Sequence, residues 1–200
     1  MNKGGTTRFR PLDEISFLLK RGGKIMKKEY LEFPSEKHEQ SMKEMIQAMK
    51  DENNPFGING DGFFERFGTY QQWVSRLKKN HLGIELDDGF VPSTEFLYVV
   101  DDVVIGCINI RHCLNEALRR QGGHIGYSIH PDYRRQGYAT DMLKQALKFC
   151  QQWEIEPVLI TCHYENIASR KTIEKCGGIF ESQYEDTLRF WIGGENNERF

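Results

Sequence analysis

Between His124 and Trp153 the sequence passes from a strand pattern through a short basic loop into a long amphipathic helix pattern. In the strand, Ile125, Tyr127 and Ile129 alternate with small or polar residues, so the three share one face. Over residues 138–153, apolar residues recur at intervals of three and four, which is typical of a helix packed on one side. The loop 131–137 therefore joins the end of a strand directly to the start of a helix.

This loop has the composition of an anion site. The first N–H groups of a helix have no intrahelical acceptor, and the helix dipole adds partial positive charge there. Gly137 and the small Ala139 let a ligand approach the backbone, while Arg134 and Arg135 add charge at the rim. The pattern predicts a site suited to a pyrophosphate.

The rest of the chain predicts helices and strands in the order α-α-β-β-β-α-β-α-β-β. Helices are expected over 35–50, 70–80 and 167–176, and strands over 96–100, 103–110, 124–130, 158–162, 179–181 and 187–192. A partly helical excursion is expected over 114–120. The glycine-rich loop between the first two helices carries four phenylalanines: Phe56, Phe63, Phe64 and Phe67.

Two segments resemble signatures of the Gcn5-related N-acetyltransferase (GNAT) family. Arg134-Arg135-Gln136-Gly137-Tyr138-Ala139 matches the family's acetyl-coenzyme A loop, Arg/Gln-x-x-Gly-x-Gly/Ala. The segment from Asn166 to Gly178 is similar to the second signature, in which an asparagine begins a helix that a glycine ends. The resemblance covers about residues 93–192 and is greatest to bacterial predicted acetyltransferases of unassigned substrate.

The resemblance implies an α/β (α+β) fold with a central mixed β-sheet of about six to seven strands, flanked by helices. The sheet would be splayed between the strand ending near His130 and the strand 158–162. The pantetheine arm of acetyl-coenzyme A (acetyl-CoA), as co-substrate, would lie in that split. The cofactor-binding residues implied are Tyr127, Ile129, Arg134, Arg135, Gln136, Gly137, Tyr138, Ala139, Thr140, Asn166, Ser169, Arg170 and Lys171.

The family's reaction, direct attack of an amine on the thioester carbonyl, suggests where to look for a base. An alkyl amine with a pKa of ~10 is almost fully protonated at pH 7, and a positioned base contributes roughly 10²–10⁴-fold. His124 stands where relatives often have a glutamate, Glu95 lies at the hairpin entry and His112 follows the third strand. The plain alternatives are a partly exposed sheet histidine for His124 and a surface carboxylate for Glu95.

The general acid departs from the family pattern. Many members place a tyrosine seven residues after the helix-start asparagine, and here that residue is Ile173. Either Tyr164 or a water serves instead, or the thiolate leaves unaided. The four-phenylalanine loop, with Asp61 and Glu65, either walls the acceptor pocket or packs as core under a long loop.

Composition excludes several other classes. The 27 Lys and Arg nearly balance the 29 Asp and Glu, giving a net charge of −2, which suits a nucleic-acid binder poorly. No apolar run approaches the ~20 residues that cross a bilayer, and no secretory signal is visible. Five cysteines without a CxxC pair indicate reduced thiols in the cytoplasm. No set of His, Cys or carboxylates has metal-ligand spacing.

The first residues differ from the remainder. Residues 1–25 are expected to form an N-terminal extension that is either flexible or not native, because Arg21-Gly22-Gly23 could be translated from a ribosome-binding sequence before a start at Met26. Residues 26–200 are expected to form a single domain.

The resulting hypothesis is an N-acetyltransferase that moves an acetyl group from acetyl-CoA to a primary amine of a small-molecule or peptide acceptor. A non-catalytic acyl-CoA-binding or sensing module on the same fold is the alternative. A nucleotide-binding protein is disfavoured because the loop lacks both Gly-Lys-Ser/Thr and Gly-x-Gly-x-x-Gly. The acceptor and a homodimeric state stay open.

Overall fold

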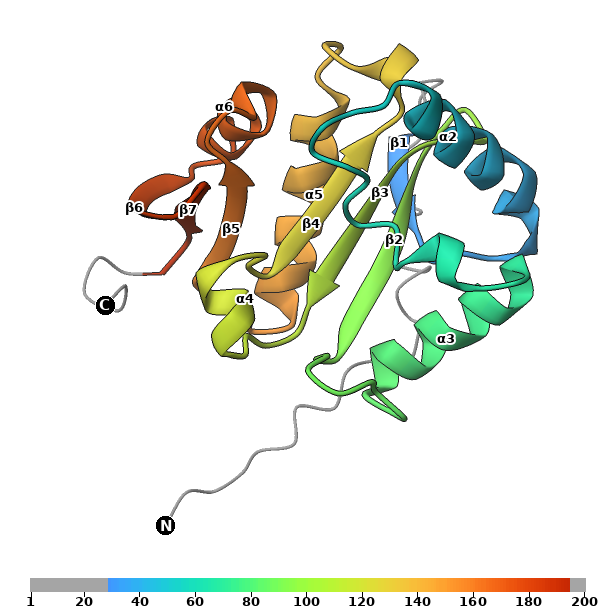
Figure 1. Ribbon diagram of the computed structural model, residues 1–200, viewed down its shortest axis with the longest axis horizontal. Coiled ribbons are helices and arrows are strands. Elements are labelled where there is room, and N and C mark those ends of the chain that lie inside the picture. Colours follow the sequence, from blue (N-terminus) through green and yellow to red (C-terminus); the bar gives the residue numbers. More distant parts are fainter. Residues whose placement is uncertain (1–28, 195–200) are drawn as a thin grey trace.

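A single seven-stranded sheet forms the centre of the computed structural model, which describes residues 29–194 (Figure 1). The strand order is β1-β2-β3-β4-β5-β7-β6, and only β4 and β5 run parallel. The strands are β1 (Glu29–Glu32), β2 (Ser93–Val100), β3 (Val103–Arg111), β4 (Ile125–Ile129), β5 (Val158–His163), β6 (Ile179–Tyr184) and β7 (Thr187–Ile192). The predicted mixed sheet and α/β fold are confirmed.

Helices cover both faces of the sheet. On one face lie α2 (Glu39–Asp51) and α3 (Tyr70–Leu82), and on the other α5 (Tyr138–Gln152) and α6 (Ile167–Lys175); the short α4 (Glu116–Arg120) lies between β3 and β4. Strand β2 shows why two cores form. Its Leu97 and Val99 belong to the cluster under α2 and α3, whereas Phe96 and Tyr98 belong to the cluster under α5.

The predicted elements agree with the observed ones, with one strand missed. Strand β1 pairs antiparallel with β2 along its four residues, and only Leu31 in it is buried. It is therefore too short to show an alternating pattern. The hypotheses about residues 1–25 and a start at Met26 lie outside the described residues. Within residues 29–194, no helix has the length and apolar character needed to span a membrane.

The sheet opens between its two parallel strands. Strands β4 and β5 share one register pair, Ile125 with Ile160, whereas β3 and β4 share five and β5 and β7 share six. Beside that pair, the His124 N–H donates to the Leu159 carbonyl at 2.7 Å. Beyond it the strands separate towards their C-terminal ends, which confirms the predicted splay (Figure 1).

Candidate functional site

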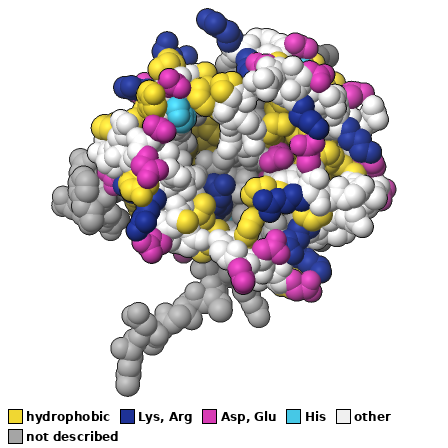
Figure 2. All heavy atoms as spheres, viewed as in Figure 1, with side chains coloured by type: hydrophobic (Ala, Val, Ile, Leu, Met, Phe, Trp, Pro, Cys, Tyr) yellow, Lys and Arg dark blue, Asp and Glu magenta, His cyan; other side chains and the backbone are white. Residues whose placement is uncertain are grey.

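The edge of β4 that faces the split is open to an extended ligand. The His130 N–H donates to the Ile105 carbonyl at 2.8 Å, so alternate residues of β4 bond to β3. By the same alternation, the main-chain groups of Tyr127 and Ile129 point towards β5, where no described residue is in register with them. Figure 2 shows the surface hollowed between the part built by β5 and α6 and the part built by β4 and the loop that crosses it.

The loop before α5 presents backbone donors. Arg135 and Gly137 both have left-handed backbones, with φ of 62° and 92°, on either side of Gln136. Among the described residues, none accepts a bond from the N–H groups of Gln136, Gly137 or Ala139, whereas the Thr140 N–H donates to the Gly137 carbonyl at 3.0 Å. A Cβ on Gly137 would have no atom within 4 Å. The concavity therefore has both donors and space for an anion.

Arg134 has a different role from its neighbours. Its Nε donates to the Ile129 carbonyl at 2.9 Å, and its guanidinium pairs with Glu52 at 2.5 Å. Arg134 thus connects the end of β4 to the end of α2, and the Ile129 carbonyl that it bonds is one of those that face the split. Arg135 is exposed, and the buried Tyr138 side chain packs in the α5 core.

The second predicted cofactor segment lies on the other side of the split. The Asn166 Oδ1 caps α6 by accepting the Ser169 N–H at 3.0 Å. The Tyr127 hydroxyl lies 3.0 Å from the Ser169 Oγ, so β4 is connected to α6. Arg170 pairs with Glu174 on the exposed face of α6, at 2.8 Å, and Lys171 is exposed beside it.

Glu95 is fully buried on the face of the sheet that α2 and α3 cover. It is in register with Asn109, which is in register with Gly126 at the point where β4 and β5 separate. Asn109 Nδ2 donates to Oε2 at 3.2 Å, whereas Oε1 has no partner among the described residues. Burial, and then the charge of Asp61, raise the pKa of the Glu95 carboxyl well above its ordinary value.

Asp61 reaches Glu95 because its loop lies against the sheet. The Asn59 N–H donates to Ser128 Oγ at 2.8 Å, and a Cβ on Gly60 would lie 2.2 Å from the Gly126 carbonyl oxygen. The Asp61 carbonyl accepts from Trp73 Nε1 at 3.1 Å. Burial raises the pKa of the Asp61 carboxyl, although backbone N–H groups that bond to it act in the opposite direction.

The phenylalanines of this loop divide between the two predicted roles. Phe64 packs in the core against Trp73, with ring centroids 5.2 Å apart. Phe56 reaches the end of β5 and lies 5.4 Å from the His163 ring, whereas Phe63 is exposed. The loop is thus anchored by core packing at one end and spans β4 to β5 at the other.

His124 lies at the vertex of the split but has no free lone pair. Its Nδ1 accepts the Leu159 N–H at 2.9 Å, so in the neutral ring the proton is on Nε2. Burial, and then Arg119 and Arg111, lower the pKa of His124 to about 4. A catalytic role for His124 stays a prediction, and this geometry does not favour it.

His112 lies away from Glu95, on the opposite face of the sheet. Its Nε2 is 2.8 Å from Thr94 Oγ1, and its ring centroid is 5.6 Å from that of Trp153. Burial, and then the charge of His81, lower the pKa of His112 to about 3. The structure therefore does not bring the three candidate bases together.

The position of the missing acid is part of the core. Ile173 is completely buried in the α5 cluster. Tyr164 is 44% exposed and stacks on His163, with centroids 4.8 Å apart. Cys162 is buried, and burial raises the pKa of its thiol to about 11, which does not suit a nucleophile paired with the adjacent His163.

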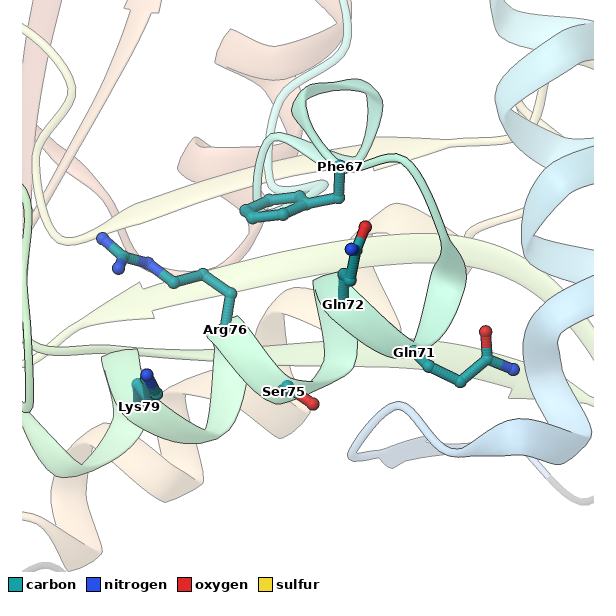
Figure 3. A pocket seen from close by; sticks show the side chains of 6 residues that line it. All are labelled: Phe67, Gln71, Gln72, Ser75, Arg76 and Lys79. Carbon is teal, nitrogen blue, oxygen red and sulfur yellow. The ribbon is translucent and has the colours of Figure 1, made fainter.

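Two hollows lie on the α2–α3 side. One, of about 520 Å³, lies between the end of α2 and the loop and is lined by residues that include Asp61, Phe63 and Glu65. The other, of about 430 Å³, lies along α3 (Figure 3). Its cations are already paired, Arg76 with Asp87 at 2.8 Å and Lys79 with Glu85 at 2.5 Å. Asp61 lines the first hollow, whereas Glu95 lines neither.

Comparison with known proteins agrees with this geometry. The family model described as "Acetyltransferase (GNAT) domain" matches residues 12–179. No curated protein matches the chain. Among solved structures, Mycobacterium smegmatis RimJ in complex with CoA-disulfide superposes with a TM-score of 0.61 at 18% identity, covering 84% of this chain and 83% of that one.

Two further structures share the fold at lower identity. Microcin C7 self immunity acetyltransferase MccE, in complex with acetyl-CoA and AMP, has a TM-score of 0.59 at 14% identity, covering 81% of this chain and 90% of its own. RimL, the ribosomal L7/L12 alpha-N-protein acetyltransferase, in complex with coenzyme A, has a TM-score of 0.56 at 14% identity, covering 80% and 90%.

Proposed function

The chain belongs to the GNAT acetyltransferase family, and we propose that it transfers the acetyl group of acetyl-CoA to a primary amine by direct attack. The observation that carries this proposal is the split between β4 and β5, which ends at a loop with unbonded backbone donors. An extended thiol arm fits beside a free strand edge, and a pyrophosphate fits a helix N-terminus.

The residues that would hold acetyl-CoA lie along this path. Main-chain groups of Tyr127 and Ile129 would bond the pantetheine arm, and N–H groups of Gln136, Gly137 and Ala139 would bond the pyrophosphate. The thioester supplies the acetyl group, and its carbonyl would lie near the vertex. There the Tyr127 N–H is the donor that we assign to the developing oxyanion.

Glu95 is the base that the geometry supports best. The amine must lose a proton before it attacks. Glu95, Asn109 and Gly126 are directly opposite one another on β2, β3 and β4, so Glu95 lies two strands, or about 10 Å, from the point where the split begins. Its raised pKa suits proton transfer near neutrality better than that of an exposed carboxylate. Asn109 fixes the orientation of Oε2 and leaves Oε1 for the amine or a water.

The leaving group needs less help. A thiol has a reference pKa of ~8.5, so a thiolate can leave without full protonation. Ile173 has no proton to donate to the leaving thiolate. The absence of a general acid at this position is the reason to keep a non-catalytic acyl-CoA-binding module as the alternative. For the acceptor we propose a small-molecule or peptide amine; RimL, which shares the fold, acts on the alpha-amino group of a protein.

The test combines two measurements on the whole chain. Isothermal titration reports acetyl-CoA binding, and a thiol reagent reports coenzyme A release with a panel of primary amines. We expect binding and amine-dependent release, with turnover reduced about 10²–10⁴-fold in Glu95→Gln. Glu44→Gln removes an exposed carboxylate of α2 and is the matched control. Binding without amine-dependent release would support the binding module instead.

A further inference from the structure

Glu95 Oε1 is a buried carboxylate oxygen that no described residue bonds. Buried polar atoms are nearly always paired, because an unpaired one costs free energy. The charges that act on Glu95 are that of another carboxylate, Asp61 on the loop, and then that of Arg111 on β3. An arrangement of two carboxylates with an unpaired oxygen lacks a donor, and an ammonium group is the donor that satisfies both charge and hydrogen bonding.

We propose that Asp61 and Glu95 together form the acceptor subsite, which selects a cationic amine that has no carboxylate on the carbon next to it. The inference rests on the proposed acetyl transfer and adds the class of acceptor. Asp61 is the specificity-determining residue in it, because it lies on the loop and borders the hollow of about 520 Å³, which is the route that we assign to the acceptor.

The loop holds the two carboxylates in one compartment. A Cβ on Gly62 would lie 3.3 Å from Glu95 Oε2 and 3.0 Å from Trp73 Nε1, so the loop backbone directly covers Glu95. Asp61 precedes Gly62 and is held by the bond from Trp73 to its carbonyl, at 3.1 Å. Glu95 is shielded from solvent, whereas Asp61 is half-buried and borders the hollow, so a charge placed at Glu95 interacts strongly.

The neighbouring cations have other contacts as well. Arg111, whose charge acts on Glu95 from β3, donates through Nη1 to the carbonyls of Gly122 and Gly123 at 3.0 and 3.1 Å. On the loop side, Lys50 pairs with Glu65 at 2.6 Å, and the Arg66 guanidinium lies over the Phe63 ring at 4.2 Å. Lys50 and Arg66 line the same hollow as Asp61, each with a contact of its own.

A free α-amino acid would therefore be a poor acceptor. Binding its amine at Glu95 would bring its own carboxylate to within several ångströms of Asp61. A like charge at ~6 Å, in an effective dielectric constant of ~20, reduces binding roughly 100-fold. An alkylamine, or an amine whose neighbouring carboxyl is an amide, as in a peptide, avoids this repulsion.

The experiment compares amines that differ only in that carboxylate: glycine with glycinamide, and alanine with ethylamine. In each pair that turns over, we expect the amine without the carboxylate to have a kcat/KM 10- to 100-fold higher. The Asp61→Asn variant should reduce that ratio at least fivefold. The amines' own protonation cancels when the ratio in the variant is divided by that in the wild type. Asp101→Asn, which changes an exposed carboxylate at the opposite end of β2 from Glu95, is the matched control.

Each result is decisive. Equal kcat/KM values for both members of each pair in the wild type would overturn the inference without any variant, which covers the case in which Asp61→Asn does not fold. A ratio unchanged in a folded Asp61→Asn variant would also overturn it. Absence of release with every amine, despite acetyl-CoA binding, would instead refute the proposed acetyl transfer and this inference with it.

Discussion

Replacing Gly60 by alanine tests whether the loop lies against β4. A Cβ there would be 2.2 Å from the Gly126 oxygen and 2.9 Å from the Tyr127 Cα, and neither backbone atom can move aside cheaply. The backbone φ of +78° adds strain for any side chain. Gly57 is the matched control, because its φ is +66° but a Cβ there would have no atom within 4 Å.

The magnitude follows from separating the two effects. A left-handed backbone costs an L-residue about 1–2 kcal/mol, and both variants incur that cost. Forcing an extra methyl group into packed backbone costs a further ~1–3 kcal/mol, which only Gly60→Ala incurs. The free energy of unfolding should therefore fall by about 1–3 kcal/mol more in Gly60→Ala than in Gly57→Ala, as measured by urea denaturation.

The same pair of variants should differ in turnover. If the loop moves away from β4 to relieve the contact, the bond from Asn59 to Ser128 is lost and Asp61 moves away from Glu95. Amine-dependent coenzyme A release should then fall further in Gly60→Ala than in Gly57→Ala. Equal unfolding free energies together with equal turnover would show that the loop does not rest on the strand, and would refute this account of the site.

The remaining predictions concern the cofactor loop and the two candidate bases. Gly137→Glu should abolish acetyl-CoA binding in titration calorimetry while the fold survives, since no atom lies within 4 Å of the new Cβ; retained tight binding would contradict the loop assignment. His124→Ala should lower stability by about 1–3 kcal/mol, because the buried Leu159 N–H loses its acceptor; turnover unchanged across pH 6–9 would exclude His124 as the base. Burial, and then Asp61, raise the pKa of Glu95, so its carboxylate forms only as pH rises through that raised pKa, and turnover should rise over the same range. Because the folded state holds this proton more tightly than the unfolded one, the Glu95 contribution to stability should fall as pH rises from about 4.5 through the raised pKa, and Glu95→Gln should lack this fall. The titrations of Asp61, Cys107 and Arg111, which interact with Glu95, must be included when the pH dependence of stability is fitted.

The backbone donors before α5 were predictable from sequence because their geometry is local. Gly137 and the first turn of α5 are adjacent in the chain, so spacing alone places the donors at the end of β4. The strand alternation around Tyr127 likewise fixes which groups face the split. The anion site before α5 follows from helix geometry, whereas the split and the residues along it were implied by the family resemblance.

The acceptor side was not predictable in the same way. Glu95 was identified as a candidate, but its burial depends on a loop more than 30 positions earlier in the chain. Asn109 and Arg111 were missed, although their signal is present: they alternate with Cys107 on a face of β3 that is otherwise apolar. Strand β1 was missed because its four residues are stabilised by pairing with β2 and by Gln145, whose Oε1 accepts the Leu31 N–H at 3.2 Å.

The contact between Tyr127 and Ser169 has a consequence for how the split works. It fastens the two halves of the open sheet to each other on the α5 side, at a hydroxyl–hydroxyl distance of 3.0 Å. The contact therefore sets the distance between β4 and α6 across the split before any ligand binds. Binding into such a preorganised slot loses little free energy to rearrangement of the protein, which leaves more of the interaction energy to hold the thioester in place.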